Sequence, residues 1–333
     1  MLNSAQEVVP MKTVKIGLLG LGNVGAGTYQ ILDMNREQVT KSTGLNIEVS
    51  KVLVRDINRK RDIDVELEML TQNPDDIIND PNIDIVVEVL GGIEPATTFM
   101  LDAMKNKKSV VTANKAAVAA NFEKLTETAK ANGVGFRYEA SVGGGIPIIN
   151  AITTVLQGNQ FVEVQGIVNG TTNYILTQMT DFGLDYADVL KKAQELGFAE
   201  ADPTADVEGI DVANKLSILI SIMFDKYVAP DAIPTTGISK ITAEEIDAAK
   251  AEGKKIKLIA YARKDGDNLE YSVKPMLLDN AHPLAGVNNE FNAVYVTGNA
   301  VGELMFYGRG AGPLPTGSAV VGDIIEISKK MYS

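Results

Sequence analysis

A short apolar run that leads directly into a glycine-rich turn constrains the fold more than any other feature of this sequence. Residues 13–19 are mostly β-branched and aliphatic, and Gly20-Leu21-Gly22-Asn23-Val24-Gly25 follows at once. Residues 26–34 then carry a helical pattern of apolar positions. Strand, GxGxxG and helix in this order predict a βα unit that binds the pyrophosphate of a dinucleotide. The alternative is a glycine-rich βα turn without a ligand.

Each glycine of the motif has a physical task in a dinucleotide site. Gly20 permits a tight turn, Gly22 lets a pyrophosphate approach the backbone, and Gly25 lets the helix pack closely on the strand. The start of the helix offers backbone N–H groups to the phosphates. We therefore predict a cofactor contact from every residue of the turn: Gly20, Leu21, Gly22, Asn23, Val24 and Gly25.

The next part of the chain alternates between strand-like and helical patterns. Further strands are predicted at 47–54, 83–90 and 109–112, and helices at 94–105 and 121–132. Alternation of this kind predicts a parallel, doubly wound sheet. The sequence thus indicates a Rossmann-type α/β domain over residues 11–138.

The end of the second predicted strand bears on the choice of cofactor. It reads Val54-Arg55-Asp56. An acidic residue there accepts a hydrogen bond from the 2′-hydroxyl of NAD, whereas an arginine pairs with the 2′-phosphate of NADP. We favour NADP through Arg55, and Asp56 keeps NAD open. The alternative is that Arg55 is only solvated.

A glycine-rich segment at 138–147 marks a crossover into a second, α+β domain, which we place at 139–307. Strand patterns at 162–168, 257–263, 269–277 and 293–297, with helices at 172–181, 186–196 and 206–224, predict an open sheet with helices on one face. Such a sheet can pair with a second copy, so this domain is expected to be catalytic and to form a homodimer. A glycine-rich turn at 308–313 and a helix at 316–330 are predicted to return the chain, over 308–333, to the first domain.

Composition excludes several kinds of chemistry. The chain has 31 Lys and Arg against 43 Asp and Glu, and a net charge of −12 argues against nucleic-acid binding. There is no cysteine, and the single histidine, His282, stands in an Asn-Ala-His-Pro sequence that predicts a surface loop. The first ten residues lack the pattern of a secretory signal, and no apolar run is long enough to span a membrane. A cytoplasmic protein is expected, in which Lys, Asp, Glu, Tyr or a cofactor carries the chemistry.

The acid-rich stretch at 193–215 holds the best catalytic candidates. Asp211 and Lys215 are four residues apart, so they share one face of the predicted helix. Lys215 precedes the apolar run 216–224, and burying a lysine is costly unless it is paired. The alternative is an ordinary surface ion pair. A lysine beside a nicotinamide can stabilise the oxygen of a reduced carbonyl and give it a proton. Lys115 follows a predicted strand at the sheet edge where α/β proteins bind ligands, and is the second candidate.

The same stretch resembles the signature of homoserine dehydrogenase. Ala193, Gly197, the Asp202-Pro203 turn, Asp206, Gly209, Asp211 and Lys215 have the spacing of that family. The segments GLGNVG, VVTANK, YEASVGGGIP and VNGTTNYIL resemble it as well, in the same order. The resemblance extends from Met11 to about Lys330.

The resemblance implies specific roles in the active site. Lys215 would give a proton to the aldehyde oxygen, Asp211 would orient it, and Lys115 would lie where cofactor and substrate meet. Substrate would contact Glu200, Asp206 and Gly170, with Glu200 holding its amino group. Gly91, Gly197 and Gly312 would join the cofactor contacts. A monovalent cation, usually sodium, would bind Glu139 and the carbonyls of Val142, Gly144 and Ile146, because hard cations prefer oxygen ligands. The alternative there is a glycine-rich hinge without an ion.

The implied reaction is the reversible NAD(P)H-dependent reduction of L-aspartate 4-semialdehyde to L-homoserine, on the route to threonine, methionine and isoleucine. Many bacterial relatives continue into a small regulatory domain, which the resemblance does not reach here, so we expect no threonine inhibition through such a domain. Two alternatives stay open. A sugar or inositol dehydrogenase would use a histidine beside its lysine. A dinucleotide-sensing module would bind the cofactor without turnover.

Overall fold

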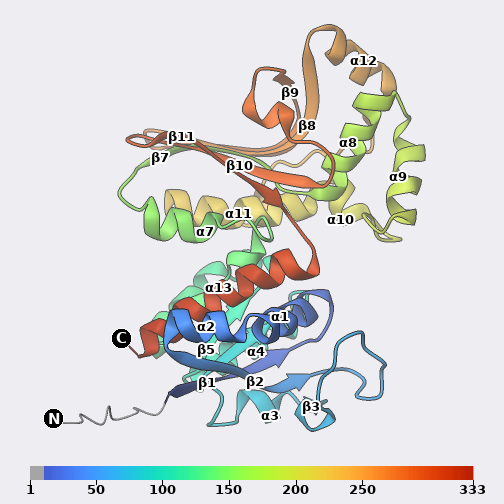
Figure 1. Ribbon diagram of the computed structural model, residues 1–333. Coiled ribbons are helices and arrows are strands. Elements are labelled where there is room, and N and C mark those ends of the chain that lie inside the picture. The colour runs from blue at the N-terminus through green and yellow to red at the C-terminus, as the bar shows by residue number, and fades with distance from the viewer. Residues whose placement is uncertain (1–10, 333) are drawn as a thin grey trace, which may run out of the picture.

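The computed structural model describes residues 11–332, and its strands form two sheets stacked along the molecule (Figure 1). The first sheet has the order β3-β2-β1-β4-β5-β6, with every neighbouring pair parallel. Its strands are β1 (Lys12–Leu19), β2 (Leu45–Leu53), β3 (Leu70–Thr71), β4 (Ile85–Glu88), β5 (Ser109–Thr112) and β6 (Phe136–Arg137). The predicted doubly wound sheet is confirmed.

Helices cover both faces of this sheet because its strands are apolar on both sides. One face packs on α1 (Asn23–Met34) and α13 (Pro313–Met331), and the other on α3 (Asp75–Ile78), α4 (Ala96–Lys105) and α6 (Phe122–Asn132). Two further helices, α2 (Arg36–Thr43) and α5 (Lys115–Ala120), complete this half.

The second sheet is antiparallel, with the order β11-β10-β7-β8-β9. Its strands are β7 (Phe161–Ile167), β8 (Lys254–Asp265), β9 (Asn268–Asp279), β10 (Phe291–Gly298) and β11 (Gly302–Arg309). The helices of this half are α7 (Ile148–Asn150), α8 (Gly170–Phe182), α9 (Tyr186–Glu195), α10 (Thr204–Val207), α11 (Ile210–Phe224) and α12 (Ala243–Ala251). Apolar residues of α8 and α11 pack on one face of the sheet, as expected for an open sheet.

Short helical turns connect these elements. They lie at Leu67–Met69 (η1), Glu139–Ser141 (η2), Ala151–Val155 (η3), Pro230–Ala232 (η4) and Pro283–Gly286 (η5). Among residues 11–332, no helix is both long enough and apolar enough to cross a lipid bilayer. The prediction about the first ten residues lies outside the described range.

Three predicted elements differ from the structure. The helix expected at 206–224 is wrong as a single element, because Gly209 has a φ of 82° and separates α10 from α11. Gly308 and Arg309, expected in a turn, are the last residues of the unpredicted strand β11, so the turn is confined to Gly310–Gly312. The last helix starts at Pro313 rather than at residue 316, because Pro suits the first helical position.

The last helix, α13, packs against α1 of the parallel-sheet half. A Cβ atom on Gly27 of α1 would lie 2.0 Å from the Pro313 carbonyl oxygen, and one on Gly317 would lie 2.7 Å from the Gly27 carbonyl carbon. The two helices can approach this closely only because both positions lack a side chain. The division into residues 11–138 with 308–333 and residues 139–307 stays a prediction.

Candidate active site

A buried ion pair lies at the start of α11. The Lys215 ammonium is 2.6 Å from Asp211 Oδ2 and donates a second hydrogen bond of 2.6 Å to the Val168 carbonyl at the end of β7. The side chains are 9% and 5% exposed, so the surface ion pair considered from the sequence is excluded. An ammonium has three N–H groups. Two are used within the described residues, which leaves one for an incoming acceptor.

Lys115 joins the same carboxylate from the other half of the molecule. It is the first residue of α5, just after β5, and α5 packs against α11. Its ammonium is 2.9 Å from Asp211 Oδ1, and its side chain is 44% exposed. Lys115 is therefore paired and not merely solvated. Asp211 lies between two lysines, one buried and one open to solvent.

The three charges shift one another's proton affinity. Burial by itself would raise the pKa of Asp211, but Lys215 and Lys115 hold it well below its usual range. Burial lowers the pKa of Lys215, against the attraction of Asp211 and with the repulsion of Lys115. Asp211 raises the pKa of Lys115. Lys215 is thus the more acidic ammonium, and so the better proton donor of the two.

Asn169, which the sequence did not single out, orders the acids around this pair. Its Nδ2 donates to Asp206 Oδ1 (2.7 Å) and to Asp211 Oδ2 (2.9 Å), while its Oδ1 caps α8 by accepting from the Thr172 N–H. The only sequence signal for Asn169 is its position before a helix, where Asn is a preferred N-cap residue. The contact with Asp206 and Asp211 depends on how α10 and α11 fold back.

The predicted substrate contacts surround this centre to different degrees. Asp206 is tied to Asn169 and also accepts from the Thr171 hydroxyl at 3.3 Å. Gly170 begins α8, and a Cβ there would lie 2.9 Å from the Glu290 carbonyl oxygen. Glu200 is exposed, and its charge contributes to the raised pKa of Lys115. Gly197 is exposed with a φ of 77°, and its contact with the nicotinamide stays a prediction.

The glycine motif has the geometry of a phosphate cradle. Gly20 has a φ of 107°, and a Cβ on Gly25 would lie 2.3 Å from the Gly20 carbonyl oxygen, so helix and turn are in close contact. A Cβ on Gly22 would meet nothing within 4 Å, which leaves the turn open to a ligand. Leu21 precedes that open position, and Asn23 and Val24 begin α1, whose N-terminus has no side-chain cap. The residues present therefore fit the pyrophosphate of a dinucleotide.

Gly91 and Gly312 lie near the same end of the sheet. Gly91 follows β4 with a φ of 82°, and a Cβ there would meet nothing within 4 Å. Gly312 has a φ of 122° and precedes α13, whose first residue, Pro313, touches Gly27 of α1. Gly91 thus belongs to the loop that borders Gly20, and Gly312 belongs to the turn before α13.

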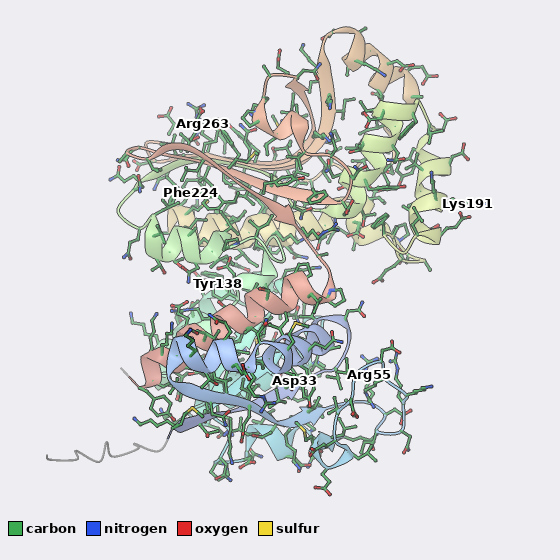
Figure 2. All side chains as sticks on the ribbon, viewed as in Figure 1. Asp33, Arg55, Tyr138, Lys191, Phe224 and Arg263 are labelled. Carbon is green, nitrogen blue, oxygen red and sulfur yellow. The ribbon has the colours of Figure 1, made fainter. Side chains whose placement is uncertain are left out.

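Arg55 and Asp56 differ in how they are engaged. Asp56 accepts a 2.8 Å hydrogen bond from the Asn58 N–H. Arg55 is exposed at the rim of the parallel-sheet half (Figure 2), and within the described part of the chain its side chain makes no ion pair. The arginine is thus available to an anionic group, whereas the carboxylate already stabilises its own turn.

Oxygen atoms gather in the crossover segment where the cation is expected. Glu139 is 5% exposed and accepts from the N–H groups of Ile149 and Asn150 at 2.8 and 2.6 Å. Gly143 and Gly144 have φ angles of 72° and 57°, which turn the backbone sharply between Val142 and Ile146. The Ile146 carbonyl accepts from the Ile148 N–H at 2.9 Å and keeps one lone pair.

Two observations favour a positive charge in that segment. Burial raises the pKa of both Glu139 and Asp323, whose Oδ2 accepts from the Glu139 N–H, and a nearby cation would stabilise their ionised forms. The buried Asn292 side chain lies against Gly310, which touches Gly144, and its Oδ1 has no partner among the described residues. The residues fit a monovalent cation, and no cluster of three acidic or histidine side chains is found in residues 11–332.

His282 lies in a loop, as predicted, but it is not a freely solvated residue. It is half-buried, its Nδ1 accepts a 3.1 Å hydrogen bond from the Leu284 N–H, and its ring lies 5.5 Å from that of Tyr295. The expectation of a surface residue is therefore only partly right. Its role is to cap η5 at the antiparallel sheet, so a lysine and histidine pair of the sugar dehydrogenase type is not formed here.

Comparisons with known proteins agree with this geometry. Two family models match, "Homoserine dehydrogenase" over residues 147–325 and "Homoserine dehydrogenase, NAD binding domain" over residues 20–139. A homoserine dehydrogenase of Bacillus subtilis is 47% identical over 321 residues, covering 96% of this chain and 74% of that protein. The second of these family models supports the dinucleotide-binding expectation for the first half.

Solved structures give the same result. A crystal structure of a homoserine dehydrogenase from Thiobacillus denitrificans aligns with a TM-score of 0.93 at 44% identity, covering 96% of this chain and 74% of that one. A hyperthermophilic archaeal homoserine dehydrogenase in complex with NADPH aligns with a TM-score of 0.79 at 27% identity, covering 96% of this chain and 98% of that one. The protein described here is a member of the homoserine dehydrogenase family of oxidoreductases.

Proposed function

We propose that this enzyme catalyses the reversible NADPH-dependent reduction of L-aspartate 4-semialdehyde to L-homoserine, with Lys215 as proton donor, in threonine, methionine and isoleucine biosynthesis. The observation that carries the proposal is the buried Lys215 ammonium, which is paired with Asp211 and keeps one N–H free of contacts among the described residues. The family relationship supports the reaction, and the geometry supports the residue roles.

In the proposed reaction, the aldehyde carbonyl takes up one hydride and one proton. When bound, the reduced nicotinamide supplies the hydride that the aldehyde carbon takes up. Lys215 donates its proton to the aldehyde oxygen, so a C–H and an O–H bond form and the carbonyl double bond becomes single. Lys215 is left neutral and still held by Asp211 and Val168 O. Burial favours this neutral form, because an ammonium in a low-dielectric site is poorly solvated.

The acids outside the ion pair are assigned to the amino group of the substrate. Glu200 is exposed and its charge acts on Lys115, so it is positioned to attract an ammonium group near the reacting atoms. Asp206 offers a second carboxylate, held in place by Asn169 and Thr171. We assign Gly170 to the wall of the substrate site, because any side chain there would clash with the Glu290 backbone.

For the cofactor we propose NADP, with NAD as a weaker substitute. Arg55 follows β2 at the position that pairs with a 2′-phosphate, and its side chain has no competing ion pair in the described residues. The archaeal relative is described in complex with NADPH. Contacts from Gly20, Leu21, Gly22, Asn23, Val24, Gly25, Gly91, Gly197 and Gly312 complete the proposed site. We propose sodium as the ion held by Glu139, Val142, Gly144 and Ile146.

We further propose a homodimer formed through the face of the antiparallel sheet that lies opposite α8 and α11. Met305 and Tyr307 on β11 are 42% and 53% exposed, and they lie opposite Tyr295 and Ala293 of β10. The next strand adds Gln165, whose buried Oε1 has no partner among the described residues. An apolar and aromatic face of this kind suits a second copy. Tyr307→Glu should lower the mass measured by light scattering to that of a monomer, and an unchanged mass would reject this surface.

We also propose two domains, one for catalysis and dimerisation and one for cofactor binding. Residues 139–307 carry Lys215 and the proposed dimer surface, and residues 11–138 with 308–333 carry the cofactor cradle. A cytoplasmic location stays a prediction.

The decisive experiment measures oxidation of NADPH and of NADH with aspartate semialdehyde, with and without sodium. Lys215→Met should lower turnover by about 10²–10⁴-fold, as expected for loss of a general acid, while NADPH binding stays near the wild-type level. Lys191→Met, an exposed lysine of α9 (Figure 2), serves as the matched control. Unchanged turnover in Lys215→Met would exclude Lys215 as the donor, and wild-type turnover with sugars alone would reject the proposed substrate.

A further inference from the structure

The carboxyl group of Glu88 is buried at the carboxyl end of β4, beneath the loops that follow β4 and β5. Glu88 is the last residue of β4, and it is fully buried. Its Oε1 accepts from the Leu90 N–H at 2.7 Å and from Asn114 Nδ2 at 3.4 Å, and its Oε2 accepts from the Thr112 hydroxyl at 2.6 Å. Within the described residues it forms no ion pair, so its role is not to balance a lysine or arginine.

One of these contacts leads to the proposed cofactor site. Leu90 begins the loop Leu90-Gly91-Gly92, in which both glycines have positive φ angles, 82° and 73°. A loop of this shape has few conformational restraints of its own. The hydrogen bond from the Leu90 N–H to Glu88 therefore fixes the start of the segment that carries Gly91.

The other contacts lead to Lys115. The Thr112 hydroxyl, which donates to Glu88, accepts from the Asn114 N–H at 2.9 Å. Asn114 caps α5 by accepting from the Ala117 N–H at 3.1 Å, and its Nδ2 donates to the Gly92 carbonyl at 2.7 Å. Lys115 is the next residue in the chain. The capped end of α5 and the glycine loop are thus joined to each other and to Glu88.

We propose that Glu88 is a positioning residue that holds the Gly91 loop and Lys115 in fixed relation, so that cofactor binding and the placement of the lysine depend on one buried carboxyl group. The inference rests on the proposed function, which assigns the Gly91 loop to the cofactor and Lys115 to the reaction site. It does not require Glu88 to touch either substrate or cofactor. A mere structural role would affect the stability of the sheet without changing the site.

Three variants separate these roles. Glu88→Ala removes both carboxylate acceptors, and Glu88→Gln keeps an oxygen for the Leu90 N–H with almost the same shape. Thr112→Val removes the hydroxyl between Glu88 Oε2 and the Asn114 N–H but keeps the Leu90 contact. The matched control is Lys108→Met, which removes a buried polar side chain bonded to the Asp80 and Ile83 carbonyls at the opposite edge of the same sheet. Each variant is assayed for thermal unfolding, for NADPH dissociation constant by fluorescence, and for turnover.

Glu88→Ala should weaken NADPH binding and lower kcat by about tenfold each, because small misplacements of positioned groups are costly in rate. Glu88→Gln should recover most of both losses. Thr112→Val should lower kcat and leave NADPH binding near wild type, since Leu90 keeps its partner. Lys108→Met should lose stability alone.

The inference is overturned if Glu88→Ala destabilises the protein as Lys108→Met does but keeps the wild-type dissociation constant and kcat. If Glu88→Ala does not fold, Thr112→Val decides, and an unchanged kcat there rejects the link to Lys115. Absence of turnover in the wild-type enzyme would instead contradict the proposed function, while the NADPH arm would still test the loop.

Discussion

At the scale of single residues, the site depends on one buried carboxylate that serves two lysines. Asp211 contacts Lys215 through Oδ2 and Lys115 through Oδ1, and Asn169 adds a hydrogen bond to Oδ2. The pair at Asp211 and Lys215 was predictable from an i,i+4 spacing, and the apolar run favoured its burial but left a surface ion pair open. Lys115 reaches the same carboxylate from a segment nearly a hundred residues away, and no local pattern predicts such a contact.

Asp211→Asn should lower the free energy of unfolding by about 3–5 kcal/mol, because it leaves a buried ammonium without its counter-charge. It should also lower kcat, since Lys215 loses its anchor. The exposed pair formed by Asp102 and Lys105 provides the control, and Asp102→Asn should cost less than about 1 kcal/mol. Urea unfolding measures both changes.

The pH dependence of the Asp211 contribution has a defined sign. Its pKa is lowered in the folded state, so the stabilisation is fully present above the ordinary carboxyl pKa and is lost as the pH falls through the folded value. The difference between wild type and Asp211→Asn should therefore stay constant from pH 8 to about pH 5 and shrink only in strong acid. A difference that disappears near neutral pH would contradict the assigned ion pair.

At the scale of elements, a single glycine decides where the acids of the signature lie. Gly209 has a left-handed φ of 82°, and a Cβ there would lie 2.9 Å from Thr235 Cγ2. The break lets α10 fold back so that Asp206 reaches Asn169. The helical pattern at 206–224 concealed this break, because one glycine in a helix is tolerated at modest cost and periodicity alone does not exclude it.

Gly209→Ala should lower stability by about 1–3 kcal/mol through backbone strain and should weaken substrate saturation by displacing Asp206. Gly158→Ala is the control, since a Cβ there meets nothing within 4 Å and its φ is not left-handed. Thermal unfolding and substrate titration report the two effects. Equal behaviour of both variants would show that the helix break is not required.

A second element-scale feature is the buried Lys257 of β8, which joins α8 to the loop before β10. Its ammonium donates to Asn173 Oδ1 at 2.9 Å and to the Val287 carbonyl at 2.6 Å, without a carboxylate contact among the described residues. Burial lowers the pKa of Lys257 to about 7. In the unfolded chain a lysine keeps its proton up to about pH 10.

Between these values the unfolded state binds more protons, so stability should rise with pH. Relative to Lys257→Met, the wild-type protein should gain up to about 1.4 kcal/mol per pH unit from pH 7 towards pH 10. Lys264 is exposed on the same strand, so the unfolding free energy of Lys264→Met should depend on pH as that of the wild type does. Unfolding free energies over this pH range test the sign, and parallel curves for Lys257→Met would contradict it.

At the scale of the whole molecule, the chain closes on itself where α13 crosses α1. The crossing depends on Gly27 and Gly317, at which a Cβ would lie 2.0 and 2.7 Å from backbone atoms of the other helix. Because α13 follows the antiparallel sheet directly, this contact joins the two halves of the molecule (Figure 1). It also brings Gly312 beside the glycine motif.

Gly317→Ala should lower the unfolding temperature and weaken NADPH binding, because the backbone of α1 cannot yield without displacing the cofactor turn. Gly322→Ala in the same helix should instead stabilise the protein by about 1 kcal/mol, since a Cβ there meets nothing within 4 Å and alanine favours a helix. Calorimetry of the two variants is the test. A stabilising Gly317→Ala would show that the crossing is looser than the geometry indicates.

The local and periodic features of this protein could be predicted from its amino-acid sequence. Alternating apolar runs specified the parallel sheet and most of its helices, and the glycine motif specified the phosphate cradle, because turns and periodicities depend on neighbouring residues. The spacing of Asp211 and Lys215 also specified one contact on a single helix face.

Which distant groups meet, and which are buried, depends on how the elements pack in three dimensions. Lys115 joins Asp211, Asn169 bridges Asp206 and Asp211, and Glu88 collects donors from two loops, all through the packing of elements far apart in the chain. The short strands β3 and β6 were not predicted, because two residues are too few to show an alternation of apolar and polar positions. Burial and long-range hydrogen bonds arise only when the whole chain is packed, and the pKa values of Asp211, Lys215 and Lys115 depend on both.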